Sequence, residues 1–382
     1  MSRTLLCTGL ALVLAAPSLA QDAAKPASKL DPALAKQADE TIDKAIAFYR
    51  TQQGPDGGLA PKVAAEMGIT GIAVASMLDT HRITASDPMI AKALAFMESN
   101  VQPDGGIYPK GVTAQQNYLT SVGLLAFVAA NKDGKYKATI DNAVKFLKGV
   151  QWNEDGKEGK NKVGPDDVRY GGFGYDSKQR PDLSNSSFTL EALTKAGMSK
   201  DDPAVKRAMV FLRRCQNYTG EGGNDKMKGS AEDADGGFFY NPFETKAAAG
   251  NTPAGGLRSY ASMTYAGLKS FVYAGLSKDD PRVKAALEWI GKHYDLNSNP
   301  GLGQKGLYYY YQVFAKALKA AEIDQLPTAS GPPREWRTDI VKQLIAKQQA
   351  DGSWVNTDKG WMENDARLVT AYSLAALANA MK

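Results

Sequence analysis

The chain has 382 residues, of which 43% are hydrophobic, a net charge of +5 and two cysteines. A chain of this length can build a large core that packing alone stabilises. Its lysines are spread along the sequence. A nucleic-acid groove needs a concentrated basic face with stacking aromatics, so we expect no nucleic-acid partner.

The first twenty residues have the features of a secretory signal peptide. Arg3 gives a basic start, residues 5–16 are apolar, and residues 18–20 form a small-residue cleavage site. No stretch is long and apolar enough for a transmembrane segment, so we expect a secreted or periplasmic protein. Residues 21–37 are rich in Ala, Lys and Pro and are predicted to be a flexible tether. Without the signal peptide Cys215 is the only cysteine, so no intrachain disulfide is expected.

From residue 38 to residue 382 a helix–turn–helix pattern recurs six times. The last copy is the clearest, with Leu344, Gln348, Gly352 and Trp354 leading from one helix through a Gly turn to the next. A repeat of this size cannot bury its apolar face alone, so the copies must pack on one another. The positions equivalent to the glutamine are read as Gln52, Asn100, Gln151, Gln216, Tyr294 and Gln348.

The two helices of each repeat differ in pattern. The first is amphipathic, with Lys and Arg between apolar residues, whereas the second is apolar on most sides and must be enclosed by other helices. Asp-Pro pairs at residues 87–88, 202–203 and 280–281 mark starts of first helices, and Gly197 and Gly275 mark ends of second helices. Six such pairs predict an all-α fold, an α/α toroid of twelve helices in one domain over residues 38–382. An open solenoid of helix pairs is the alternative.

The repeats resemble the prenyltransferase and squalene-cyclase repeat family of the terpenoid cyclase and protein prenyltransferase superfamily. The Gln348, Gly352 and Trp354 turn is similar to the Gln-Trp motif of squalene–hopene cyclases, and the six-unit order is similar over roughly residues 40–382. The resemblance implies the toroid and a central cavity. It does not by itself imply an activity, because one fold carries many functions.

Two catalytic motifs that the resemblance implies are not intact. Cyclases of this family carry Asp-x-Asp-Asp before the inner-helix hydroxyl, and here the stretch reads Asp182-Leu183-Ser184-Asn185-Ser186. Prenyltransferases carry Asp-x-Cys at the same place and a later His, which bind zinc. Here Ser184 replaces the cysteine, and His81 and His293 are displaced. We therefore expect no zinc site, no other metal and no cofactor.

Polar and aromatic residues gather where the second helices begin. A column of hydroxyls consists of Thr70, Thr120, Ser186, Thr264, Tyr311 and Thr370, and aromatic residues at the same level include Tyr118, Tyr260, Tyr265, Tyr308–Tyr311 and Trp361. All second helices should begin at one mouth of the ring. Asp182, Asn185, Tyr260, Tyr309 and Asp365 are expected to meet there. The candidate catalytic residues are Asp182, Tyr309, Glu363 and Asp365, and the candidate ligand-binding residues are Asn185, Ser186, Arg258, Tyr260, Tyr309 and Tyr310.

Three functions stay open from the sequence, so turnover is undecided. The first is a binding or interaction module whose cavity holds an apolar, isoprenoid or carbohydrate ligand. The second is a diverged terpenoid-cyclase-like or prenyl-lipid enzyme. The third is a polysaccharide lyase or hydrolase on a toroid, which paired carboxylates in an open groove would favour.

Overall fold

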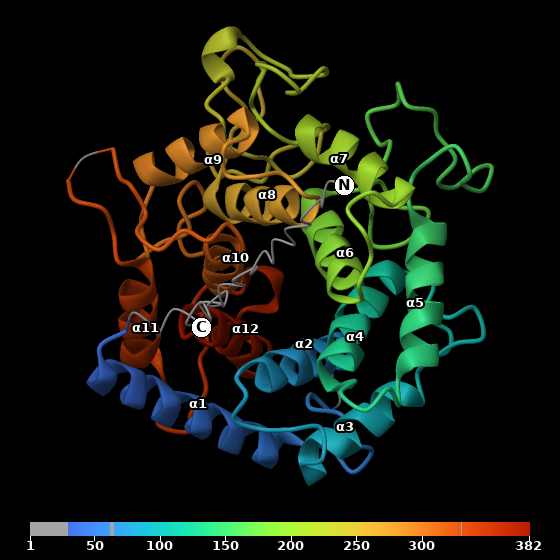
Figure 1. Ribbon diagram of the computed structural model, residues 1–382, viewed down its shortest axis with the longest axis vertical. Helices are drawn as coiled ribbons and strands as arrows, with labels where there is room; N and C mark the ends of the chain where they lie inside the picture. Colours follow the sequence, from blue (N-terminus) through green and yellow to red (C-terminus); the bar gives the residue numbers. More distant parts are fainter. Residues whose placement is uncertain (1–29, 62–64, 330) are drawn as a thin grey trace, which may run out of the picture.

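The computed structural model describes residues 30–61, 65–329 and 331–382. The predicted signal peptide and most of the predicted tether lie outside these residues. Twelve α-helices in the described part form two concentric rings (Figure 1). The outer ring consists of α1 (Pro32–Gln52), α3 (Pro88–Glu98), α5 (Lys137–Val150), α7 (Pro203–Arg214), α9 (Pro281–Lys292) and α11 (Trp336–Lys347). The inner ring consists of α2 (Glu66–Asp79), α4 (Gln116–Ala130), α6 (Leu183–Lys195), α8 (Ala261–Tyr273), α10 (Leu307–Ala320) and α12 (Ala366–Ala380).

The rings reflect the two helix patterns. In α7 the apolar side chains Val205, Ala208 and Leu212 are buried, while the intervening Lys206 is exposed. In α12 almost every residue is buried, including the polar Ser373. The connections between the helices include the one-turn helices η1 (Ala231–Asp233) and η2 (Gly360–Met362). The described residues form isolated β-bridges but no strand. The all-α prediction is therefore confirmed.

The ring is closed, which excludes the open solenoid. Each inner helix packs against the next, and α12 packs against both α10 and α2. In the outer ring, the side-chain amide of Gln348 donates a 2.8 Å hydrogen bond to the carbonyl of Thr41 in α1. The last repeat is thereby joined to the first.

The repeated glutamine links neighbouring outer helices. Gln151 donates to the carbonyl of its own turn, Gly171, and to Ala204 at the start of the next outer helix, with distances of 2.9 and 2.8 Å. In the first repeat this role belongs to Gln53, which donates to the carbonyls of Gly57 and Met89. The sequence alignment at Gln52 was therefore wrong by one residue. The correct alignment follows the distance to the turn glycine: Gly57 lies four residues after Gln53, just as Gly352 lies four residues after Gln348.

The turn glycine has two reasons to be glycine. Gly352 has a φ of 89°, and a Cβ there would lie 2.4 Å from the carbonyl oxygen of Lys44. Gly57 has a φ of 101° and an equally close approach to Lys92. Positive φ is a conformation that side chains other than glycine rarely adopt. Outer helices can therefore approach these turns only where a side chain is absent.

The Asp-Pro start signals are confirmed, and they also correct the predicted tether. Asp87, Asp202 and Asp280 each accept a backbone hydrogen bond as the N-cap of α3, α7 and α9. The same signal occurs at Asp31, whose carboxylate accepts from the backbone of Ala33 and Leu34 and begins α1 at Pro32. Residues 32–37 are consequently helical, and the tether predicted over residues 21–37 was drawn too far along the chain.

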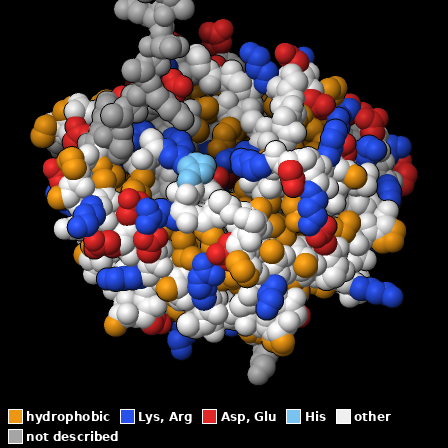
Figure 2. Space-filling model, turned by 60° about the horizontal axis from the view of Figure 1, so that its bottom comes forward, with side chains coloured by type: hydrophobic (Ala, Val, Ile, Leu, Met, Phe, Trp, Pro, Cys, Tyr) orange, Lys and Arg blue, Asp and Glu red, His pale blue; other side chains and the backbone are white. Residues whose placement is uncertain are grey.

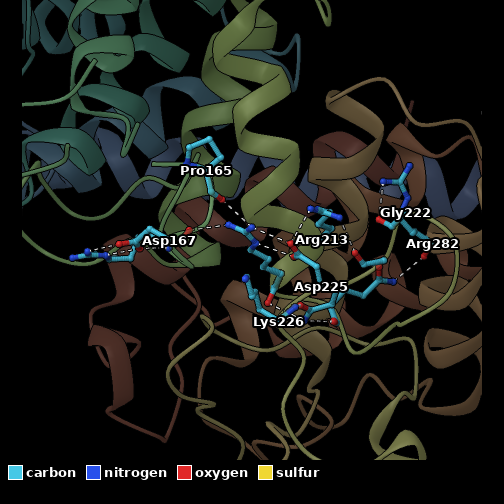
Figure 3. A network of polar contacts seen from close by, with 12 residues as sticks. Pro165, Asp167, Arg213, Gly222, Asp225, Lys226 and Arg282 are labelled. Carbon is cyan, nitrogen blue, oxygen red and sulfur yellow. Dashed lines mark hydrogen bonds and ion pairs between the residues drawn. The ribbon is translucent and has the colours of Figure 1, made fainter. Parts of the chain in front are cut away.

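Two Gly- and Asp-rich insertions, residues 153–167 and 219–234, are tied together by one buried arginine. The guanidinium of Arg214 binds the carbonyls of Pro165 and Asp167 in the first insertion and the carboxylate of Asp225 in the second (Figure 3). Arg213 adds a second contact to Asp225. Arg214, the last residue of α7, therefore links the two insertions.

The surface carries mixed charge. Basic and acidic side chains are interspersed over the face that Figure 2 shows, with apolar side chains between them. This agrees with the even spread of lysine in the sequence. Among the described residues, no helix combines the length and the apolar character that crossing a membrane requires.

Candidate functional site

A cavity of about 230 Å³ lies where the six inner helices begin. Every inner helix contributes the residue two positions before its column hydroxyl. Successive helical residues are rotated by about 100°, so two residues apart they point to nearly opposite sides. The column hydroxyl points toward the turn of its repeat, so the residue two positions before it faces the centre of the ring. These residues are Gly68, Tyr118, Ser184, Ser262, Tyr309 and Leu368.

Aromatic rings form most of the cavity wall. Tyr118 packs edge to face against Phe188, with ring centroids 5.6 Å apart, and Phe188 lies 6.2 Å from Tyr309. Tyr309 in turn packs against Tyr372 at 6.0 Å. Such edge-to-face pairs hold rings in fixed orientations and leave other ring surfaces for a ligand. Tyr175, Tyr240, Tyr260 and Trp361 complete the aromatic wall, beside aliphatic residues such as Ile69, Leu119 and Met263.

The phenols of this wall are neutral. Burial raises the pKa of Tyr118, Tyr309 and Tyr372 above the ordinary value of a tyrosine. Burial and the nearby carboxylate of Asp182 raise the pKa of Tyr175 to about 12. The Tyr309 hydroxyl also shares a 2.9 Å hydrogen bond with Ser184. The cavity thus offers ring faces and uncharged hydroxyls.

Glu363 is the carboxylate among the described residues that line the cavity. It is fully buried, and its oxygens accept from the backbone of Tyr309 at 2.7 Å and Tyr308 at 3.2 Å, and from the amide of Asn356 at 2.7 Å. Burial raises the pKa of Glu363, although these three donors oppose the shift. A carboxylate at a helix N-terminus is electrostatically favourable. Glu363 therefore caps α10, and its acceptor sites are largely occupied.

Asp182 lies behind the cavity wall. Its carboxylate caps α6, accepting from the backbone and the side-chain amide of Asn185 at 2.8 and 2.7 Å. Burial raises the pKa of Asp182 to about 6, partly offset by bonds from Asn185 and from the phenol of Tyr240. Tyr240 itself lines the cavity. The side-chain oxygen of Asn185 is buried without a hydrogen-bond partner among the described residues.

Five residues were expected to meet at the mouth of the ring, and two of them line the cavity. Tyr260 and Tyr309 line the cavity, whereas Asp182, Asn185 and Asp365 do not. Asp365 caps α12 and pairs with Arg367. N-cap side chains fold back onto the backbone of their own helix, so they turn away from the ring centre.

The remaining predicted binding residues also lie outside the cavity lining. Tyr310 points into the core, where its hydroxyl donates to the carbonyl of Asp295, and Arg258 lies half-buried before α8. The Ser186 hydroxyl bonds to the backbone of Phe173. The same bond, from the turn residue to the column hydroxyl, is made by Thr70, Thr120, Thr264 and Thr370. The column is therefore a structural feature of the repeat.

Several cavity residues were missed from the sequence. Tyr175 and Tyr240 lie in the connections before α6 and α8, and no repeat pattern marks them. Tyr372 and Phe188 could have been found, because each lies two residues after a column hydroxyl. Ser184 faces the cavity at the place where the cyclase motif has its second aspartate. The described residues contain no group of three His, Cys, Asp or Glu side chains placed to hold a metal ion.

The comparisons with known proteins agree with this fold. The family model of the squalene-hopene cyclase C-terminal domain matches residues 60–240. Among solved structures, an apo type II terpene cyclase from Scytonema is similar at 14% identity and a TM-score of 0.56, covering 92% of this chain and 99% of that chain. The same cyclase in complex with geranylgeranyl dihydroxybenzoate, its substrate, is similar at 13% identity and a TM-score of 0.55, covering 91% and 99%.

Carbohydrate-active toroids are similar to the same degree. A family 76 glycoside hydrolase from a bovine Bacteroides thetaiotaomicron strain has 12% identity and a TM-score of 0.55, covering 89% of this chain and 77% of that chain. A search of curated protein sequences found no match. The chain has the terpene-cyclase-like α/α toroid fold, as its resemblance to the squalene-cyclase repeats predicted. At these identities the structural likeness shows the fold alone.

Proposed function

We propose that the protein binds an apolar, isoprenoid-like ligand in the tyrosine-lined cavity and does not transform it. One observation carries this proposal: all six inner helices contribute a residue to the lining of one cavity, whose wall is aromatic and aliphatic, with uncharged hydroxyls. Pockets for small apolar molecules have this composition, with a few polar groups for orientation. The substrate complex of the Scytonema cyclase supports a prenyl-type ligand for this fold. We further propose that the protein acts outside the cytoplasm, because of its signal-like first residues.

The polar groups of the cavity favour binding over catalysis. Glycoside hydrolysis uses two carboxyl groups about 5–10 Å apart. Here the carboxylate on the lining is Glu363, and its oxygens are engaged by α10 and Asn356. Protonating an alkene needs an acid that faces the ligand, and Ser184 stands where the cyclase motif has one.

One observation supports acid-initiated cyclisation as a second candidate. Asp182 has a pKa raised to about 6, and it contacts the cavity through the phenol of Tyr240. A carboxyl group that is partly protonated near neutral pH can act as a general acid, here by passing a proton through that phenol. The loss of product formation in an Asp182→Asn variant would distinguish this candidate from simple binding.

Ligand binding can be tested by filling the cavity. A Cβ on Gly68 would lie 3.2 Å from Leu119 and 3.3 Å from Tyr118, so Gly68→Leu places its side chain against the cavity wall. Gly149 in α5 is a matched control, because a Cβ there meets nothing within 4 Å. We expect geranylgeraniol to bind the wild type and Gly149→Leu, and to bind Gly68→Leu at least tenfold more weakly by tryptophan fluorescence.

Mass spectrometry of the incubated ligand completes the test. Recovery of unchanged geranylgeraniol supports the binding role, whereas a cyclised isomer overturns it in favour of the second candidate. Equal affinity of Gly68→Leu and the wild type would show that the cavity is not the binding site.

A further inference from the structure

The opposite end of the toroid holds a second pocket. The tyrosine-lined cavity lies at the N-terminal ends of the inner helices, and this second pocket lies at the C-terminal ends of several of them. There a pocket of about 220 Å³ opens between α2, α4, α6 and α10. We name it the lysine pocket after its lining residues Lys132, Lys195 and Lys316.

The floor of the lysine pocket is a buried triad with unequal charge. The carboxylate of Glu191 pairs with Lys269 at 2.6 Å and with Lys316 at 2.8 Å. The side chains of Glu191 and Lys269 are 1% exposed, and that of Lys316 is 11% exposed. Two ammonium groups on one carboxylate leave an excess positive charge where desolvation makes it costly. A further anion would compensate it.

The charges of the triad are consistent with this account. Although burial opposes ionisation, Lys269 and Lys316 hold the pKa of Glu191 well below its ordinary value. Burial lowers the pKa of Lys269 to about 8, against the attraction of Glu191. The Lys269 ammonium is therefore only weakly stabilised by its single carboxylate partner.

Helix ends do not account for the whole cluster. Lysine is favoured at a helix C-terminus, which explains Lys195 as the last residue of α6. Lys269 and Lys316 lie four residues before the ends of α8 and α10, and both point at Glu191. Gln312, one turn before Lys316 on the same face of α10, has a buried amide without a hydrogen-bond partner among the described residues. Lys269, Lys316 and Gln312 are thus buried polar groups whose presence the helix ends do not explain.

The other wall of the lysine pocket is apolar. It is formed by Ala75 of α2 and by Leu125, Val128 and Ala129 of α4. The acids on the lining are Glu191, already paired, and Asp79, which lies 3.7 Å from Lys195. A fitting ligand has one anionic group and a short apolar body. We propose that the lysine pocket binds a small organic carboxylate, with Lys316 and Lys195 at its head and the α4 wall against its chain.

Titration calorimetry with hexanoate at constant ionic strength tests the proposal. We expect one hexanoate to bind per chain, hexanol to produce no binding heat, and Lys316→Gln to weaken hexanoate at least tenfold. In this variant Glu191 and Lys269 still form an ion pair, so no buried charge is left unpaired. Lys137→Gln on the outer helix α5 is the matched control and should bind as the wild type does, because its side chain is 74% exposed and remote from the inner ring.

Two further variants keep the result decisive. If Lys316→Gln does not fold, Lys195→Gln and Ala129→Phe should each weaken hexanoate, the first through charge and the second by filling the apolar wall. Gly68→Leu should leave hexanoate affinity unchanged, which separates this pocket from the tyrosine-lined cavity. Absence of hexanoate binding, or binding that none of the lysine-pocket variants weakens, overturns the proposal. Binding of inorganic phosphate without hexanoate overturns the organic class.

Discussion

The two ends of the inner ring are built from the same helices but stabilise their buried polar groups in different ways. At the N-terminal end, phenols whose pKa is raised by burial form a neutral wall, and Glu363, the carboxylate on the described part of the lining, caps a helix. At the C-terminal end, a carboxylate and two ammonium groups are buried together. Backbone N–H groups at helix starts can satisfy a carboxylate without a cation. Away from the helix starts Glu191 lacks these donors and depends on side-chain charge.

The largest expected effect comes from breaking the charged end. Glu191→Gln leaves Lys269 and Lys316 without a counter-charge, and we expect unfolding free energy to fall by about 3–5 kcal/mol. Glu363→Gln at the other end is the matched comparison and should cost about 1–2 kcal/mol, because its partners are neutral donors. Urea unfolding measures both. Equal losses would contradict the distinction between the two ends.

The next prediction concerns how the free energy of unfolding depends on pH through Asp182, at the N-terminal end of the inner ring. Because the folded pKa of Asp182 is raised to about 6, its contribution to stability is complete below the ordinary aspartate pKa and is lost as pH rises through about 6. The shift corresponds to about 3 kcal/mol. In Asp182→Asn this pH dependence should disappear, so the variant gains stability relative to the wild type between pH 4 and pH 7. Urea unfolding across that range checks it, and an unchanged pH profile would mean that Asp182 is not buried as described.

A change in the outer ring should affect both ends together. Gly352→Val forces a branched side chain into positive φ and against the carbonyl of Lys44, so we expect a loss of about 1–3 kcal/mol. Gly149→Val, on an exposed part of α5, is the control for valine in place of glycine. If calorimetric melting of Gly352→Val matches this control, the close approach of the turn to α1 is not needed.

The smallest effect concerns one hydroxyl of the neutral wall. Tyr309→Phe keeps the ring contacts with Phe188 and Tyr372 but removes the hydrogen bond to Ser184. The expected loss is about 0.5–1.5 kcal/mol, measured by urea unfolding. A Ser184→Ala variant should produce a similar loss. A double variant that loses the sum of both would show that the two hydroxyls do not interact.

The fold could be predicted from the sequence because each repeat carries local signals for where its helices begin, turn and pack. Asp-Pro starts, Gly turns and small-residue inner helices each occur several times, so a degenerate copy such as the one at Tyr294 did not mislead. The cavity was harder to predict. Tyr260 and Tyr309 were placed there correctly, but Asp182 and Asp365 were not, since their role as N-caps turns them away.

The lysine pocket had no visible signal in the sequence. Glu191, Lys269 and Lys316 lie on three different repeats, and each alone resembles an ordinary charged residue near a helix end. Only the closed ring shows that the three side chains converge. The same holds for Arg214, whose three partners in the two insertions, Asp225, Asp167 and Pro165, lie 11 to 49 residues away along the chain.

The hydrogen bond from Gln348 to Thr41 has a kinetic consequence. It joins two residues that are 307 positions apart, and the packing of α12 on α2 spans a comparable distance. Contacts this distant in sequence carry a high loop-closure entropy and form slowly. The nascent chain would therefore exist first as an arc of helix pairs with its inner face exposed to water. Both pockets come into being only when this arc closes, so ligand binding would report the last step of folding.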